Sequence, residues 1–222
     1  MDHPERLAVF GDIHANLPAL EAVLRAIADM GITRAVLTGD IVLRGLEPEK
    51  CVACVRATGW PCVEGNTDRR VVGKKVKAGT HPSDMRPGTR TWTKTMLSEK
   101  SLNWLDSLPH LAETTLGSHR VVAVHGDLPG LEGHSATDAQ VIATMDALGA
   151  DVLVTAHTHF AAVRWIGGRL MINPGAVGEG APDDQRPSWA WLEAGPHGLH
   201  AAIEHVDAPL APPRDAAHRK GE

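Results

Sequence analysis

The sequence predicts an α/β protein in which two mixed sheets pack face to face and helices cover both outer faces. The first third alternates short apolar runs with amphipathic segments, and this β-α-β-α-β order favours parallel strands joined by right-handed crossovers. The second half carries two hairpin signals instead, which favour antiparallel strands. Side chains that bind metals end several of the apolar runs. Ligands of open α/β sheets lie beyond the carboxyl ends of the strands, so we expect these side chains to gather at one edge.

The composition is that of an ordinary soluble globular protein. At 222 residues the chain fits one large domain, and 43% of its residues are hydrophobic and 22% charged. The net charge of −5 does not favour nucleic-acid coating or membrane attachment. No apolar run approaches the roughly 20 residues that span a bilayer. The first residues do not resemble a signal peptide and three cysteines cannot build a disulfide framework, so we expect a cytoplasmic protein.

The first half predicts two helices and three strands. Asn16 can cap a helix that has Pro18 in its first turn and that ends at Gly31, because leucine and isoleucine recur at helical spacing between them. A second helix is expected to begin near Pro48. The expected strands are Leu7–Phe10, Ala35–Thr38 and Pro61–Glu64.

The second half predicts further strands, one helix and two hairpins. The helix runs from Thr137 to Leu148 with its apolar residues on one face, and Gly149 is its stop signal. Gly167-Gly168 favours a two-residue hairpin turn, and a second turn is expected between Gly195 and Gly198. The expected strands are Val121–Val124, Asp151–Thr155, the two halves of Trp165–Leu170, and the pair Ser188–Glu193 and Leu199–Val206.

The segment from about Val71 to Pro109 breaks this rhythm. Its first half is basic and interrupted by Gly and Pro, and its second half has apolar residues at helical spacing. We interpret 71–109 as a helical excursion beside the site and not as a separate domain. Residues 1–206 then form a single domain, and 207–222, rich in Pro, Ala and charge, are expected to be a disordered tail.

Five short motifs bring side chains that bind metals to the ends of apolar runs. They supply two carboxylates, one amide and four imidazoles, and this oxygen and nitrogen set suits two divalent ions that share one carboxylate. Asp40, at the end of the second strand, is the natural bridging residue. The candidate metal ligands are Asp12, His14, Asp40, Asn66, His125, His157 and His159.

Each of these residues has an ordinary structural explanation when it is taken alone. An aspartate can cap a helix, Asn66 can occupy a turn, and His125 can be a core histidine with satisfied hydrogen bonds. Seven such residues at successive strand ends are harder to explain in this way, because buried charges are unfavourable unless they are paired or bound to metal. We therefore favour a metal centre.

These motifs resemble those of the calcineurin-like metallophosphoesterases, in particular the small bacterial and archaeal phosphoesterases of that superfamily. The similarity runs from Gly11 to about Glu193. The resemblance implies a four-layer α/β/β/α sandwich with a dinuclear metal site at the strand ends. The matching motifs are Gly-Asp12-Ile-His14-Ala-Asn16, Gly39-Asp40-Ile-Val42, Gly65-Asn66-Thr-Asp68, His125-Gly126-Asp127, His157-Thr-His159 and Asn173-Pro174-Gly175.

The resemblance also assigns the ligands and their roles. Two ions in such a site activate a water and stabilise an in-line transition state, which makes Asp40, Asn66 and His125 the catalytic candidates. Mn²⁺ is the expected metal, with Fe, Co, Ni or Zn as alternatives, because this ligand set accepts all of them. One ion would be held by Asp12, His14, Asp40 and His159, and the other by Asp40, Asn66, His125 and His157.

The implied activity is hydrolysis of phosphodiester or nucleotide phosphoanhydride bonds. In the protein-phosphatase branch of the superfamily a histidine follows the metal-binding asparagine and protonates the leaving group, whereas this chain has Thr67. A threonine hydroxyl is a poor general acid near neutral pH, so we expect leaving groups that need little protonation. A phosphomonoesterase similar to the protein phosphatases and a non-catalytic scaffold on the same fold, like the retromer subunit, are the alternatives.

A basic stretch follows the asparagine motif. From Arg69 to Lys94 there are eight basic residues and one acid, so this stretch carries +7 and the rest of the chain −12. It could steer a phosphorylated small molecule or nucleotide to the site, with Arg69, Arg70 and His134 as substrate-binding residues. A solvated helix face or an oligomer contact is the alternative, which leaves a homo-oligomer open. We expect neither a membrane nor a stable nucleic-acid partner.

Overall fold

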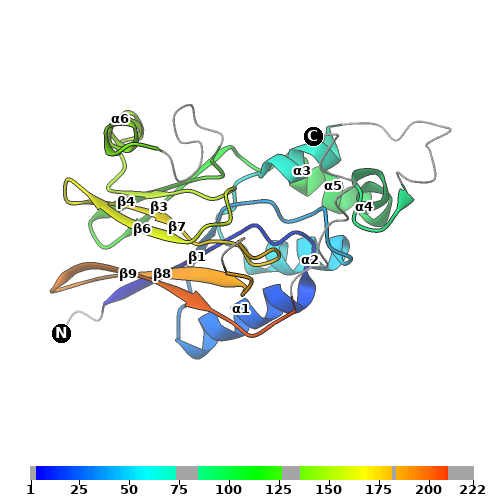
Figure 1. Cartoon of the computed structure of the whole chain (residues 1–222), viewed down its shortest axis with the longest axis horizontal. Coiled ribbons are helices and arrows are strands. Elements are labelled where there is room, and N and C mark those ends of the chain that lie inside the picture. Colours follow the sequence, from blue (N-terminus) through cyan, green and yellow to red (C-terminus); the bar gives the residue numbers. More distant parts are fainter. Residues whose placement is uncertain (1–3, 74–84, 127–135, 182–183, 210–222) are drawn as a thin grey trace.

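The computed structural model describes residues 4–73, 85–126, 136–181 and 184–209, and two sheets form its centre (Figure 1). The strand order is β2-β1-β8-β9 in the first sheet and β3-β4-β5-β7-β6 in the second. The first sheet contains β1 (Glu5–Phe10), β2 (Ala35–Leu37), β8 (Ser188–Gly195) and β9 (Gly198–His205). The second contains β3 (Leu111–Leu116), β4 (His119–Val124), β5 (Val152–Val154), β6 (Ala162–Ile166) and β7 (Arg169–Asn173).

Both sheets are mixed, as predicted. In the first sheet β1 pairs with β2 in parallel, whereas β8 pairs antiparallel with β1 and β9. In the second sheet β5 lies parallel to both β4 and β7, and the outer strands β3 and β6 are antiparallel to their neighbours. The parallel strands therefore end at one edge, where loops from both sheets can meet.

Helices cover the two outer faces of the sheets and one end of them (Figure 1). The helices α1 and α2 lie on the outside of the first sheet and α6 on the outside of the second, while α3, α4 and α5 lie together at one end. The α4 and α5 helices contact α2 and α3. The helices are α1 (Leu17–Asp29), α2 (Pro48–Thr58), α3 (Asn66–Val72), α4 (Arg90–Met96), α5 (Glu99–Asp106) and α6 (Asp138–Leu148).

Three apolar cores correspond to the three interfaces between layers. The core between the sheets includes Leu7 and Val9 of β1, which meet Val121 and Val154 of the second sheet. The alternate residues of β1, such as Phe10, belong instead to the core beneath α1 and α2, as expected for side chains that alternate across a strand. A third core joins the outer face of the second sheet to α6. The four-layer α/β/β/α architecture is therefore confirmed.

Local signals explain where several elements begin and end. The Asn16 side chain accepts a hydrogen bond from the backbone N–H of Ala19 at 3.2 Å and caps α1, as predicted. Gly149 ends α6 in the left-handed conformation (φ 62°). Gly167 and Gly168 both have positive φ, 58° and 80°, which a two-residue hairpin turn between β6 and β7 requires.

Three elements differ from the sequence predictions. The expected strand Pro61–Glu64 is reduced to an isolated bridge between Leu37 and Cys62, because Pro61 has no N–H and the N–H of Glu64 bonds to Pro109 at 2.9 Å. The strand β3 and the helix α3 were not anticipated. Of the expected tail, 207–209 are described and 210–222 lie outside the described residues. Among the described helices, none is both long and apolar enough to cross a membrane.

Candidate metal centre

The predicted ligands lie in loops that follow strand ends. Asp12 follows β1, Asp40 follows β2, and His125 comes directly after β4. The loops after β1 and β2 continue to hydrogen-bond beyond the strands, since Asp12 N–H bonds to Gly39 O and His14 N–H to Asp40 O, each at 2.9 Å. The two sheets thus present their carboxyl ends to each other at the end of the molecule that also carries α3 (Figure 1).

One group of ligand atoms contains Asp12, His14 and His159. The Nε2 atoms of the two histidines are 3.1 Å apart. Asp12 Oδ1 lies 3.3 Å from His159 Nε2 and 3.8 Å from His14 Nε2. Asp12 and His14 are fully buried, whereas 13% of the His159 side chain is exposed. These three atoms lie close enough together to hold a single metal ion.

A second group forms around Asn66 and His125. The Oδ1 atom of Asn66 lies 2.9 Å from His125 Nε2 and 2.8 Å from His157 Nδ1. His125 Nε2 is in turn 3.4 Å from Asp40 Oδ1. His157 is exposed, so the centre opens to solvent on that side.

Asp40 lies between the two groups. Its Oδ1 atom faces His125, and its Oδ2 atom lies 3.8 Å from His14 Nε2. Only 1% of Asp40 is exposed. One oxygen is therefore available on each side, the arrangement that a carboxylate shared by two cations needs.

The donor set fits divalent cations. Asp12 Oδ1 is buried and has no hydrogen-bond partner of good geometry among the described residues. A buried carboxylate oxygen is unfavourable unless a charge or a donor compensates it. Oxygen and imidazole nitrogen donors together suit ions such as Mn, Fe, Co, Ni or Zn.

The electrostatics of the centre show how strongly the buried groups act on one another. Burial and the charge of Asp12 raise the pKa of Asp40. Burial alone would raise the pKa of Asp12, but the nearby imidazoles of His159 and His125 outweigh it and lower the pKa. Burial alone would lower the pKa of His125, but the charges of Asp40 and Asp12 outweigh it and raise the pKa. Two carboxylates in one buried space therefore demand compensating positive charge.

The backbone at the ligand positions is unusual. Five of the seven predicted ligands have positive φ angles between 49° and 74°. Residues with side chains adopt this left-handed conformation at a cost of about 1–3 kcal/mol, and such strain concentrates at functional sites. The five residues are Asp12, His14, Asp40, His157 and His159.

Glycines allow the loops to approach closely. A Cβ atom at Gly65 would lie 2.0 Å from Asp40 Oδ1, and one at Gly178 would lie 1.9 Å from Ile13 O. Contacts this short leave no room for a side chain at either position. The glycines that precede Asn66 and follow the Asn173 motif therefore bring separate loops into contact at the centre.

Neighbouring side chains hold the ligands in place. His125 Nδ1 lies 2.7 Å from Thr38 O, which leaves Nε2 directed at the ligand group. Asp68 accepts hydrogen bonds from the N–H groups of Ile41, Val42 and Gly65 at 2.9, 3.1 and 3.0 Å. It thereby joins the Asp40 loop to the Asn66 loop. Burial and the charge of Asp40 raise the pKa of Asp68 to about 7, although these N–H groups oppose the shift.

The predicted substrate residues are less closely connected to the centre. Arg69 and Arg70 are exposed on α3, and Arg69 Nε lies 3.4 Å from Glu64 Oε1. His134 lies outside the described residues. Sequence reasoning missed the contact of Glu64 with His110, and also the ion pair of Glu179 with Arg44 near His159. Neither pair has a signal in the sequence, because its members come from segments far apart in the chain.

Comparisons with known proteins identify the family of the chain. Residues 6–195 match the model of the calcineurin-like phosphoesterase superfamily domain. An uncharacterized protein of Methanocaldococcus jannaschii is 30% identical over 171 residues, which are 77% of this chain and 69% of that protein. A probable metallophosphoesterase of Bacillus subtilis is 38% identical over 63 residues, 28% of this chain and 36% of the relative.

Solved structures show the same fold. The crystal structure of a metallophosphoesterase from Sphaerobacter thermophilus has a TM-score of 0.72 at 30% identity and covers 92% of this chain and 89% of its own. Vacuolar protein sorting 29 of Cryptosporidium parvum has a TM-score of 0.57 at 17% identity, with 92% and 99% covered, and shows likeness of fold alone. The chain belongs to the calcineurin-like phosphoesterase superfamily.

Proposed function

We propose that the chain is a dinuclear metal-dependent phosphoesterase that hydrolyses phosphodiester or nucleotide phosphoanhydride bonds. The observation that carries the proposal is the position of Asp40, which directs one carboxylate oxygen to His125 and the other toward His14. A mononuclear or purely structural site would not need a buried carboxylate between two groups of nitrogen and oxygen donors.

Each ion would have its own set of ligands around the shared carboxylate. When bound, the two ions would supply Lewis acidity for an attacking water and for the phosphoryl oxygens. Asn66 and His125 would position the substrate side of the centre, because His157 beside them is the exposed ligand. The first ion would be held by Asp12, His14, Asp40 and His159, and the second by Asp40, Asn66, His125 and His157.

The substrate class follows from what the site offers the leaving group. Thr67 is fully buried and its hydroxyl donates to Val42 O at 2.9 Å, so it has no access to a substrate. The position after Asn66 therefore supplies no acid, which favours bonds whose leaving groups need less protonation, as in nucleotide anhydrides and activated diesters, unless a residue elsewhere supplies the proton. Arg69 and Arg70, exposed on α3, would attract substrates with several phosphates. Mn²⁺ is the first metal to test.

Turnover of bis(4-nitrophenyl) phosphate tests the hydrolase proposal. We expect activity with added Mn²⁺ that a chelator removes and that metal restores. Asp40→Asn should abolish it, whereas Asp146→Asn, at an aspartate whose side chain is 64% exposed on α6, should not. A protein that binds two equivalents of metal yet hydrolyses neither diesters, dinucleoside polyphosphates nor phosphomonoesters would contradict the proposal.

The same panel separates the alternatives. Faster hydrolysis of phosphomonoesters or a phosphoserine peptide than of diesters would favour a phosphatase. A scaffold on this fold would bind a protein partner and show no turnover at all. Its only structural support is the likeness of fold to vacuolar protein sorting 29.

A further inference from the structure

The position that follows Asn66 does not supply a proton donor. Departure of an alkoxide or phenolate from phosphorus is assisted by an acid that protonates the leaving oxygen. Thr67 cannot act in this way, because its hydroxyl is buried and bonded to Val42 O. A donor from this chain would have to reach the substrate from the rim of the centre.

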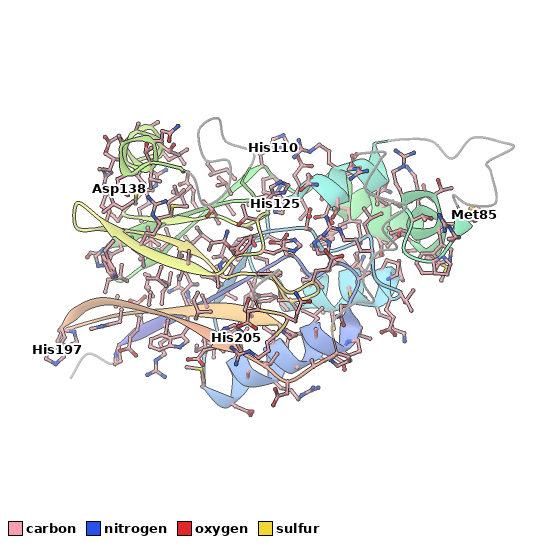
Figure 2. All side chains as sticks on the ribbon, in the orientation of Figure 1. Met85, His110, His125, Asp138, His197 and His205 are labelled. Atoms are coloured by element: carbon pink, nitrogen blue, oxygen red, sulfur yellow. The ribbon has the colours of Figure 1, made fainter. Side chains whose placement is uncertain are left out.

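His110 lies at that rim. Leu111 of β3 pairs with Val124 of β4, and both residues pack into the core beneath α6. Continued by one residue beyond its end, this register would place His110 opposite His125, with both side chains toward the other sheet because side chains alternate across a strand. Adjacent strands lie about 4.8 Å apart, so the two residues would then be neighbours. Figure 2 labels both at the same end of the sheets.

Glu64 holds the ring of His110. His110 Nδ1 lies 2.5 Å from Glu64 Oε1. The two segments are also joined by a backbone hydrogen bond from Glu64 N–H to Pro109 O at 2.9 Å. Arg69 Nε lies 3.4 Å from the same Oε1 atom, so both a guanidinium and an imidazole face this carboxylate.

The burial of the pair is unequal. Only 10% of the Glu64 side chain is exposed, whereas 80% of the His110 side chain is exposed. A carboxylate that is fixed by the fold thus engages Nδ1 of a ring whose Nε2 remains accessible. Buried carboxylates orient catalytic and metal-bound histidines in the same manner.

We propose that His110, oriented by Glu64, contacts the phosphoryl group and protonates the leaving oxygen. This role rests on the phosphoesterase function proposed above. Water adds its oxygen to phosphorus and releases a proton to solvent as the bond from phosphorus to the leaving oxygen breaks. The leaving oxygen keeps the electron pair of that bond and takes the proton from His110 Nε2. The exposed ring then regains a proton from solvent.

A series of methyl aryl phosphates, from 4-nitrophenyl to phenyl, tests the proton transfer. We expect His110→Gln to lower kcat for the phenyl ester about 100-fold, since general acids contribute at least that much, and for the 4-nitrophenyl ester less than about threefold. Glu64→Gln should reproduce part of this pattern, because the ring would keep a hydrogen-bond acceptor but lose the charge that holds it. An equal loss along the series, or no loss, would overturn the proposal.

His197 provides a matched control. It is an exposed histidine in the turn between β8 and β9, at one tip of the molecule and away from His110 (Figure 2). His197→Gln should leave rates along the series unchanged. Metal content should be the same in the wild-type protein and in both histidine variants, and a loss of metal in His110→Gln would show that the residue acts on the ligands and overturn the proposal.

A measurement without turnover separates this proposal from the proposed function. In the Zn²⁺-loaded protein, inorganic phosphate should shift the ring resonances of His110 and not those of His197. Absence of a shift at His110 would overturn the contact even in an active enzyme. A shift at His110 together with no hydrolysis of any ester would reject the hydrolase function and the proton transfer.

Discussion

Removal of the Asp68 carboxylate should destabilise the protein by separating its two central ligand loops. Asp68 is fully buried and accepts backbone hydrogen bonds from Ile41, Val42 and Gly65. In Asp68→Ala all three N–H groups lose their acceptor, at about 1–3 kcal/mol each, so we expect a loss on the order of 3–9 kcal/mol. That is a large share of the roughly 5–15 kcal/mol that stabilises a typical domain.

Asp68→Asn should destabilise the protein less than Asp68→Ala, for a geometric reason. The amide keeps one oxygen, which can still accept from Ile41 and Val42, but its NH₂ group would face the Gly65 N–H. The expected loss is therefore that of a single buried donor, about 1–3 kcal/mol. Asp146→Ala, which removes an exposed partner of Arg169, should change stability by less than about 1 kcal/mol.

Urea unfolding of the chelator-treated proteins measures these differences. The six tryptophans provide a fluorescence signal, and the absence of metal removes any contribution of ligand binding to the apparent stability. The wild type and Asp146→Ala should have the highest urea midpoints, Asp68→Asn a lower one and Asp68→Ala the lowest. An Asp68→Ala protein as stable as Asp146→Ala, or an Asn variant as unstable as the Ala variant, would refute the reasoning.

Three further predictions concern the centre, the basic helix and the junction of α2 with α5. Asp40→Asn should weaken binding of both metals while circular dichroism stays unchanged; two full equivalents in an active variant would contradict a shared carboxylate. Replacement of Arg69 and Arg70 by Ala should raise KM for a polyphosphate more than for a nitrophenyl ester, and more so at low salt; equal effects at all salt concentrations would exclude steering. Partial burial alone would raise the pKa of Glu49, but hydrogen bonds from Ser98 and Ser101 outweigh it and lower the pKa. Glu49→Gln should therefore lower the stability by about 1 kcal/mol at pH values above the unfolded pKa of about 4.3, and this difference should vanish as pH falls through the lower folded pKa. A stability difference that does not change with pH would contradict this prediction.

Much of the fold could be predicted because its signals are local. The apolar runs of β1 and β4, the Asn16 cap and the Gly167-Gly168 turn each identify an element from a few adjacent residues. The candidate metal ligands could be proposed because carboxylates and imidazoles follow these runs directly. The two-sheet architecture followed from the change from parallel to antiparallel signals along the chain.

The missed features depend on contacts between distant segments. The edge strand β3 buries only Ala112 and Leu116 among its six residues, and its ladder is formed with β4 alone. The pair of Glu64 with His110 exists because one strand register and one backbone bond bring the segments together. The shortening of the Pro61–Glu64 strand has a similar cause, since the Glu64 N–H finds its acceptor outside the first sheet. No sequence window contains both partners of such contacts.

Activity and folding stability oppose each other in the loops of the metal centre. A glycine at Asp12 or His157 would remove a ligand and also relieve a left-handed backbone that costs other residues about 1–2 kcal/mol. A substitution that inactivates the protein at these positions therefore also relieves backbone strain, and at Asp12 it removes a buried charge. A library selected only for heat resistance or yield would accumulate inactive proteins, so any stabilised form of this enzyme has to be selected for turnover at the same time.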